Sequence, residues 1–173
     1  GFGESHGSAS GRQAVICDAV AALDAMLAQQ EVDPDRVALF GQSLGGAVGL
    51  SLLGRRSDFK CAVLERPFAS WRLAAATALG GSRPNVIVRA LCWLFVSDGD
   101  APIDALSTTD TPILIIHGAN DTLVPVVHGE RLRDSSPDQV TLLAFEGGGH
   151  NTLQETHPEA RRAVLEFLRK HLE

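Results

Sequence analysis

Short apolar segments alternate along this chain with longer segments in which apolar residues recur at helical spacing. The short segments are apolar at nearly every position rather than at every second position. Such runs are typical of parallel strands that are covered on both faces of a sheet. We therefore expect a mostly parallel sheet, with strands at 36–40, 62–65, 111–117 and 140–145.

The longer segments between these strands predict helices. Apolar residues recur at helical spacing in the first of them, and Pro158 suits the first turn of the last. The predicted helices are 12–30, 44–53, 126–133 and 157–171. Residues 1–11 are rich in glycine and serine, which favours a loop. The repeated order of strand and helix predicts an α/β fold with helices on both faces of the sheet.

The interval 67–107 is longer than a simple crossover between two strands requires. It contains several large apolar side chains, and we expect it to form a short cap above the functional site. The candidate substrate-contacting residues in this cap are Trp71, Trp93 and Phe95. A stripe at helical spacing within the cap is expected to pack in the core or the cap rather than line a ligand pocket. Its members are Val86, Ile87, Leu91, Leu94 and Phe95.

Length and charge limit the class of protein. The chain has 173 residues, 45% of them hydrophobic, which predicts one compact domain covering residues 1–173. Its formal charge is −6, and the basic residues are scattered except at 55–56 and 161–162. This distribution argues against nucleic acid as a partner. The longest apolar stretch, 86–96, is about half the length that a membrane span needs.

The cysteines give an indication of the cellular compartment. Cys17, Cys61 and Cys92 all lie in apolar surroundings, and an odd number cannot pair completely within one chain. Buried, reduced thiols are the simplest interpretation, and they favour the cytoplasm. The histidines show no metal-ligand spacing, so we expect neither a metal nor another cofactor.

The pentapeptide Gly41-Gln42-Ser43-Leu44-Gly45 follows a predicted strand and precedes a predicted helix. This G-x-S-x-G pattern in this context is typical of the nucleophile elbow of serine hydrolases. A serine on so sharp a turn has a strained backbone, and glycines beside it let the strand and the helix approach each other. Ser43 is therefore the candidate nucleophile.

A serine hydroxyl needs a base within hydrogen-bond reach and an acid that orients the base. Asp121 and His150 follow the third and fourth predicted strands, in the chain order that α/β-hydrolases use. Because parallel strands end at the same edge of a sheet, both side chains can converge on Ser43. Glu65 is an alternative acid, since it also ends a buried strand. His117 is expected to stabilise the loop that presents Asp121.

Through these motifs, the chain resembles α/β-hydrolases of the serine aminopeptidase-like and prolyl-oligopeptidase-like branch. The resemblance implies that Ser43, Asp121 and His150 are the nucleophile, the acid and the general base, and that the backbone N–H of Leu44 supplies half of the oxyanion hole. It rests on four segments: Gly1-Phe2-Gly3-Glu4-Ser5, residues 41–47, His117-Gly118-Ala119-Asn120-Asp121 with its continuation to Pro125, and Gly149-His150.

The chain departs from this family at its start. In the family, strands precede the segment that matches Gly1, and the second oxyanion donor comes from a loop among them. The chain therefore resembles the C-terminal portion of the fold, truncated at the N-terminus. The predicted strand 37–40 would then be an unpaired apolar edge. We expect an upstream segment, a separate chain or a swapped neighbour to pair with it, or else the fragment to depart from the family's sheet.

The resemblance implies a serine hydrolase, with carboxyl esters as the first candidate substrates. Amides and thioesters remain alternatives because the same triad chemistry cleaves them. A further alternative is a non-catalytic or weakly active fragment that serves as a binding or assembly module. The missing donor motivates this alternative, since loss of one oxyanion hydrogen bond costs on the order of 10²–10³ in turnover.

Overall fold

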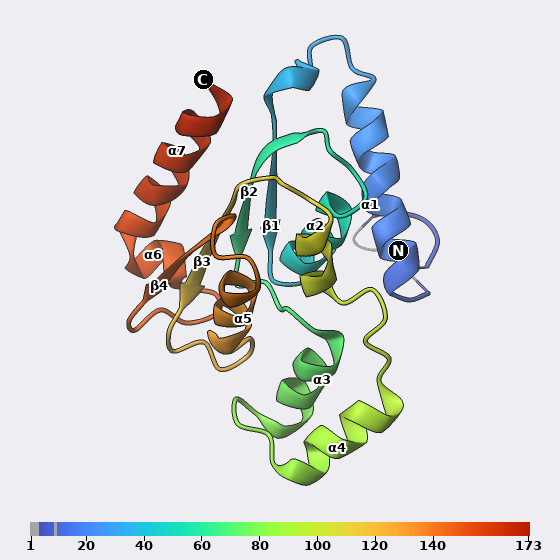
Figure 1. Ribbon diagram of the computed structural model, residues 1–173, viewed down its shortest axis with the longest axis vertical. Coiled ribbons are helices and arrows are strands. Elements are labelled where there is room, and N and C mark those ends of the chain that lie inside the picture. Colours follow the sequence, from blue (N-terminus) through green and yellow to red (C-terminus); the bar gives the residue numbers. More distant parts are fainter. Residues whose placement is uncertain (1–3, 9) are drawn as a thin grey trace.

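The structure is a computed structural model that describes residues 4–8 and 10–173 (Figure 1). Gly1, Phe2 and Gly3, which carry part of the predicted family resemblance, lie outside the described residues. The elements in chain order are α1 (Arg12–Leu27), η1 (Pro34–Arg36), β1 (Val37–Gln42), α2 (Leu44–Leu53), β2 (Phe59–Glu65), α3 (Trp71–Gly80), α4 (Val86–Phe95), η2 (Pro102–Ser107), β3 (Ile113–Gly118), α5 (Val127–Ser135), β4 (Val140–Phe145), α6 (Leu153–Thr156) and α7 (Pro158–Leu172). The two η elements are short 3₁₀ helices.

The four described strands form one parallel sheet in the order β1-β2-β3-β4. The predicted parallel sheet is thus confirmed. The register pairs Gln42 with Glu65 at the ends of β1 and β2, and Gly118 with Phe145 at the ends of β3 and β4. All four strands therefore end at the same edge of the sheet, and the loops that follow them gather there.

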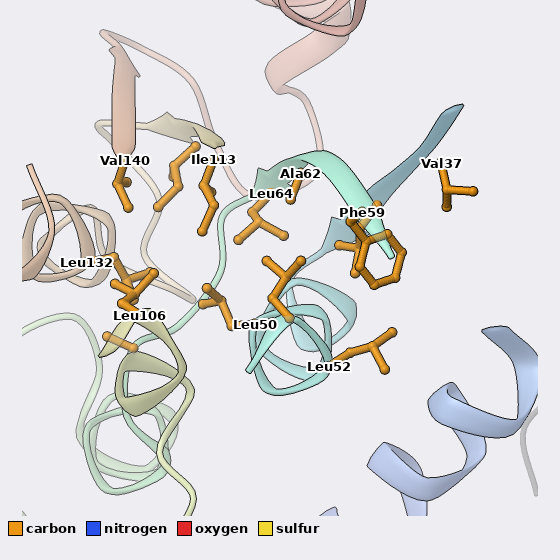
Figure 2. Close-up of a cluster of buried hydrophobic side chains, with 14 of the residues drawn as sticks. Val37, Leu50, Leu52, Phe59, Ala62, Leu64, Leu106, Ile113, Leu132 and Val140 are labelled. Atoms are coloured by element: carbon orange, nitrogen blue, oxygen red, sulfur yellow. The ribbon is translucent and has the colours of Figure 1, made fainter. Parts of the chain in front are cut away.

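Helices cover both faces of the sheet, as predicted. On one face, β1 to β4 pack against α1, α2, η2 and α5, and the shared core includes Leu23 of α1. Figure 2 shows the part of this core that Leu50, Leu64, Leu106 and Leu132 contribute. On the other face, side chains such as Val63 and Ile116 pack against α6 and α7. Burial of the sheet on both faces explains why β2 and β3 have no alternation of polar and apolar residues.

The strand β1 lies at the edge of this sheet. It pairs with β2 on one side, and no other described strand pairs with it on the opposite side. Phe40 on this strand is exposed. The predicted edge position of this strand is thus confirmed for the described residues. An edge strand with free N–H and C=O groups is a natural site for pairing with a further strand.

Two sequence-based expectations about burial were wrong. Cys17 is exposed, because α1 turns Ile16 and Leu23 toward the core and leaves Cys17 on its outer side. The stripe on α4 was expected to be packed, yet its members are exposed. The helix packs against α3, and Cys92 is the α4 residue that it buries. Figure 1 shows the reason: α3 and α4 extend away from the sheet, beyond its carboxyl edge.

None of the described helices is both long enough and apolar enough to cross a bilayer.

Candidate active site

Ser43 occupies a strained turn between β1 and α2. Its φ of 52° and ψ of −114° lie in a region that residues with a side chain rarely adopt. A Cβ on Gly41 would lie 2.5 Å from the carbonyl oxygen of Gly45, so a glycine is required there for the strand and the helix to meet. The N–H of Ser43 donates to the carbonyl oxygen of Glu65 at 2.8 Å, which ties the turn to the end of β2.

The N-terminus of α2 adjoins this turn. The N–H groups of Gly46 and Ala47 donate to the carbonyl oxygen of Ser43. Among the described residues, no backbone carbonyl accepts the N–H of Leu44. The first N–H groups of a helix have no partner inside it and carry partial positive charge, so they can stabilise an anion.

Asp121 lies in the loop after β3, and its carboxylate is held by that loop. The side chain is buried, and its Oδ1 accepts hydrogen bonds from the backbone N–H groups of Leu123 at 2.9 Å and Val124 at 2.8 Å. These bonds fix one oxygen of the carboxylate. The other oxygen, Oδ2, is turned toward the loop that follows β4.

The loop after β4 lies directly against the end of β3. A Cβ on Gly118 would lie 2.1 Å from the carbonyl oxygen of Gly148, so the two backbones meet only because Gly118 has no side chain. Asn120 joins the same two loops. Its N–H donates to the carbonyl oxygen of Gly148 at 3.2 Å, and its Oδ1 accepts from the N–H of Gly147 at 2.9 Å. This contact brings the loop that carries His150 to the loop that carries Asp121.

His150 connects Asp121 to Ser43. Its Nδ1 lies 2.7 Å from Oδ2 of Asp121, and its Nε2 lies 3.1 Å from Oγ of Ser43. With the proton on Nδ1, the imidazole donates to the carboxylate and accepts from the serine hydroxyl. The structure therefore brings together the three residues that the sequence indicated as nucleophile, base and acid. This arrangement can take a proton from the hydroxyl of Ser43 and stabilise the resulting imidazolium.

Two fully buried histidines form hydrogen bonds with loops that surround the site. His117 donates its Nε2 proton to the carbonyl oxygen of Val124 at 2.8 Å, in the loop that holds Asp121. His128 accepts at Nδ1 from the N–H of Ala69 at 3.1 Å. Burial lowers the pKa of His117, and it lowers the pKa of His128 to about 4. Both rings are therefore neutral at neutral pH and act as fixed hydrogen-bonding groups.

Glu65, the alternative acid, has other partners. Its carboxylate accepts from Nη2 of Arg66 at 3.0 Å and from Nε2 of Gln42 at 3.3 Å. Both members of the Glu65–Arg66 pair are almost completely buried. Burial raises the pKa of Glu65, although the charge of Arg66 opposes the rise. The Nδ1 atom of His150 is directed to Asp121, so the geometry favours Asp121 over Glu65 as the orienting acid.

The candidate cap residues differ in their relation to this site. Trp71 packs, with Phe68, against Ala47 of α2 and Val124 of the acid loop, and the rings of Phe68 and Trp71 lie 4.8 Å apart edge to face. Trp93 and Phe95 lie on α4, are exposed, and do not belong to this cluster. The sequence analysis did not identify Phe68 as a residue near the site. Its position shortly after β2, at the carboxyl edge of the sheet, was a signal that could have indicated this.

The connection between α3 and α4 also approaches the acid loop. Ser82 and Arg83 line a hollow of about 470 Å³ whose other wall is formed by residues 119–122 and 125–127. The hollow includes Asp121, so the insertion borders the candidate site from the side. No group of three or more His, Cys, Asp or Glu side chains that could hold a metal ion occurs in the part of the chain that the structure describes.

The chain is similar in sequence to known proteins. The family description "Prolyl oligopeptidase family" matches residues 4–173. The alpha/beta hydrolase domain-containing protein WAV2 of Arabidopsis thaliana is 30% identical over 189 residues, which cover 99% of this chain and 58% of that protein. The chain spans about half the length of the curated relatives it matches.

Solved structures share the fold. The acylaminoacyl peptidase of Pyrococcus horikoshii superposes with a TM-score of 0.76 at 18% identity, covering 91% of this chain and 27% of that one. An acetyl xylan esterase from a Paenibacillus species superposes with a TM-score of 0.72 at 20% identity, covering 92% and 53%. Because the family match extends over nearly the whole chain, this protein belongs to the prolyl oligopeptidase family of α/β-hydrolases.

Proposed function

We propose that this protein is a serine hydrolase that cleaves carboxyl esters through a covalent acyl-enzyme. The observation that carries the proposal is the continuous contact from Asp121 through His150 to Ser43, with separations of 2.7 and 3.1 Å. Asp121 is the orienting acid, His150 the general base and Ser43 the nucleophile. Three residues from three separate loops meet in the order that acyl transfer requires.

In the first half of the reaction, Oγ of Ser43 forms a bond to the substrate carbonyl carbon while its proton moves to Nε2 of His150. The charge on the former carbonyl oxygen faces the N–H of Leu44 at the start of α2. The tetrahedral intermediate then expels the alcohol, which takes the proton from His150. Asp121 accepts from Nδ1 throughout and stabilises the imidazolium.

In the second half, His150 removes a proton from water, and the hydroxide formed attacks the acyl carbon. Collapse of the second tetrahedral intermediate releases the carboxylic acid and returns the proton to Oγ of Ser43. The strained backbone of Ser43 holds Oγ in the same position in both halves. No cofactor enters either half of this scheme.

The second oxyanion donor is proposed to come from a segment that pairs with β1. Two observations support this: β1 has one side free of described strands, and the relatives are longer than this chain. A strand added there would end beside Ser43, at the same edge of the sheet. Without such a donor, the site would turn over about 10²–10³ times more slowly, and the chain could serve mainly as a binding module.

Amide bonds are the second candidate substrate class. Membership of the prolyl oligopeptidase family favours them, and the fold is shared with an acylaminoacyl peptidase. The triad chemistry is the same, but an amine is a poorer leaving group and depends more on proton donation by His150. Initial rates on an aryl ester, an aryl amide and an aryl thioester with one acyl group would rank the three classes.

The proposal is tested by Ser43→Ala in the full-length protein, with hydrolysis of a short-chain aryl ester as the assay. We expect turnover to fall by about 10⁴-fold or more, with an unchanged circular dichroism spectrum. Ser107→Ala is the matched control, because this serine is exposed and donates only to the carbonyl oxygen of Asp104. Equal activity in the Ser43→Ala variant and the unmodified protein would refute the assignment.

Labelling with a fluorophosphonate separates an enzyme from a binding module. Covalent capture requires an activated serine, so we expect label on Ser43 and none in the Ser43→Ala variant. A folded protein that takes up no label would favour the binding module.

A further inference from the structure

The helix α4 exposes an unusually large apolar surface. Its outward side chains are between 51% and 78% exposed, and Leu79 on the neighbouring helix α3 is equally open. Isolated exposed apolar residues are ordinary, but a contiguous group on one short helix marks an interaction surface. We call this group the α4 face; it consists of Val86, Ile87, Leu91, Leu94 and Phe95.

The α4 face is directed away from the rest of the protein. Val88 and Cys92, one turn apart, are the least exposed side chains in the body of the helix and lie on its inner side. Ile87, Leu91 and Leu94 are spaced by four and three residues, so they form a continuous row on the outer side. At 1.5 Å per residue, the ten-residue helix presents a row about 15 Å long.

The position of α4 makes this surface accessible. Figure 1 shows α4 at the end of the molecule that lies farthest from α7, with no other element beyond it. A flat surface could therefore approach the helix along its whole length.

The charge around the α4 face has the opposite sign to that of the whole chain. Residues 67–97 contain three arginines, Arg72, Arg83 and Arg89, and no aspartate or glutamate. All 21 acidic residues of the chain lie elsewhere, and they give it its formal charge of −6. Arg83 and Arg89 are exposed, and Arg72 lies 5.6 Å from the ring centre of Trp93. This end of the molecule is therefore locally cationic.

The acidic side chains that follow this segment in the chain, Asp98 and Asp100, are already engaged, and so is Asp121, which lines the same hollow as Arg83. Asp98 accepts from Oγ of Ser70 at 2.7 Å and from the N–H of Trp71 at 2.8 Å, so it caps the start of α3. Asp100 lies 3.8 Å from Arg55 at the other side of the connection. Among the described contacts, neither of these two carboxylates forms an ion pair with Arg83 or Arg89.

We propose that the α4 face docks the protein on an anionic membrane surface. A helix with Val, Ile, Leu and Phe on its open side and arginines beside them is typical of helices that lie in the interface plane of a bilayer. The apolar row inserts among the headgroups, while Arg83 and Arg89 meet anionic lipids. The α4 face binds at the membrane surface and does not cross the bilayer. Docking in this way places the carboxyl edge of the sheet toward the lipid.

A second copy of the chain fits this surface less well. Two-fold contact through the α4 face would bring Arg83 and Arg89 of one copy close to the same residues of the other. Like charges at an interface oppose association, whereas an anionic lipid surface attracts both arginines. The charge therefore favours a membrane over self-association.

The test is co-sedimentation of the full-length protein with phosphatidylcholine vesicles, prepared with and without phosphatidylglycerol. We expect binding to the anionic vesicles and much weaker binding to the neutral ones. Ile87→Asp with Leu94→Asp should lower the partition coefficient by at least about tenfold, because two buried apolar side chains are replaced by charges. Arg83→Glu with Arg89→Glu should lower it by at least about 20-fold.

Matched controls lie on α7, at the opposite end of the molecule. Leu165 is an exposed apolar residue, and Arg161 and Arg162 are exposed basic residues. Leu165→Asp and Arg161→Glu with Arg162→Glu should leave the partition coefficient within about twofold of the unmodified protein, since salt screens charges beyond about 10 Å. The Ser43→Ala variant should bind like the unmodified protein, so the result does not depend on the proposed catalysis.

Three outcomes would overturn the proposal. The first is absence of binding to anionic vesicles, as expected if a further segment of the full-length protein covers α4. The second is equal binding by the α4 variants and their α7 controls. The third is a protein that is dimeric in solution and becomes monomeric on Ile87→Asp with Leu94→Asp, because this would assign the α4 face to a second copy.

Discussion

The buried histidine His128 makes the stability of this protein depend on pH in a way that can be calculated. The ring on α5 is fully buried, and its Nδ1 accepts from the N–H of Ala69. Nε2, which carries the proton, has no hydrogen-bond partner among the described residues. Protonation of Nδ1 would place a charge in the core and remove the bond to Ala69. For these reasons, the folded protein lowers the pKa of His128 to about 4.

The direction of the effect follows from the two pKa values. An unfolded chain protonates this histidine near its ordinary pKa of about 6.5, while the folded protein protonates it only near 4. As the pH falls between these values, the unfolded state binds a proton that the folded state does not. The contribution to stability is therefore complete above pH ~6.5 and is lost toward pH ~4, with a total of about 3 kcal/mol.

Charged groups around the ring modulate this loss. Desolvation is the largest cause of the lowered pKa, and the charges of His117 and Arg131 act in the same direction. Asp121 opposes them. His117 itself has a pKa lowered chiefly by burial, so it adds to the loss of stability at low pH. A variant at His128 isolates the contribution of this one histidine to the total loss of stability at low pH.

His128→Asn is the appropriate perturbation, because an amide oxygen can accept from the N–H of Ala69 but does not titrate. The free energy of unfolding should be measured by urea denaturation at pH 7 and pH 4. We expect the unmodified protein to lose about 3 kcal/mol more than the variant between these two values. Equal losses in the two proteins would show that His128 is not held neutral, and would refute the reasoning.

The remaining predictions concern the site and its scaffold. Asp121→Asn should lower ester turnover by about 10⁴-fold with the fold retained, whereas an effect below tenfold would assign the orienting role elsewhere. Glu65→Gln should instead lower the free energy of unfolding by about 3–5 kcal/mol in chemical denaturation, because it leaves the buried charge of Arg66 uncompensated. Gly41→Ala should destabilise the protein, since its Cβ would meet the carbonyl oxygen of Gly45. Gly45→Ala should alter the melting temperature far less, because nothing lies within 4 Å of its Cβ; equal effects would contradict the packing argument.

The strands and several helices could be predicted from the sequence because they follow from local pattern. The bounds of α2, Leu44–Leu53, and of β4, Val140–Phe145, agree with the prediction, and the other three strands differ from it only at their ends. The helix α1 stops at Leu27, three residues earlier than predicted, and is followed by a turn. Helix ends depend on a few capping contacts, so periodicity alone places them poorly.

The exposure of single side chains could not be predicted in this way. Apolar spacing on α4 indicated a helix correctly, but it did not reveal which side of the helix meets the rest of the protein. Likewise, Cys17 has apolar neighbours in sequence yet lies on the outer side of α1. Spacing defines a face, and only the position of the helix in the fold decides whether that face is covered.

The sequence by itself determined the candidate chemistry. The G-x-S-x-G pattern and the order of strands indicated Ser43, Asp121 and His150, because such motifs encode local backbone geometry and chain order. The tertiary structure decided how these residues meet and which acid faces the base. Gly118 and Gly148 bring two loops into contact, and this contact directs His150 toward Asp121 while Glu65 pairs with Arg66. These relations join residues far apart in the chain, so no local pattern records them.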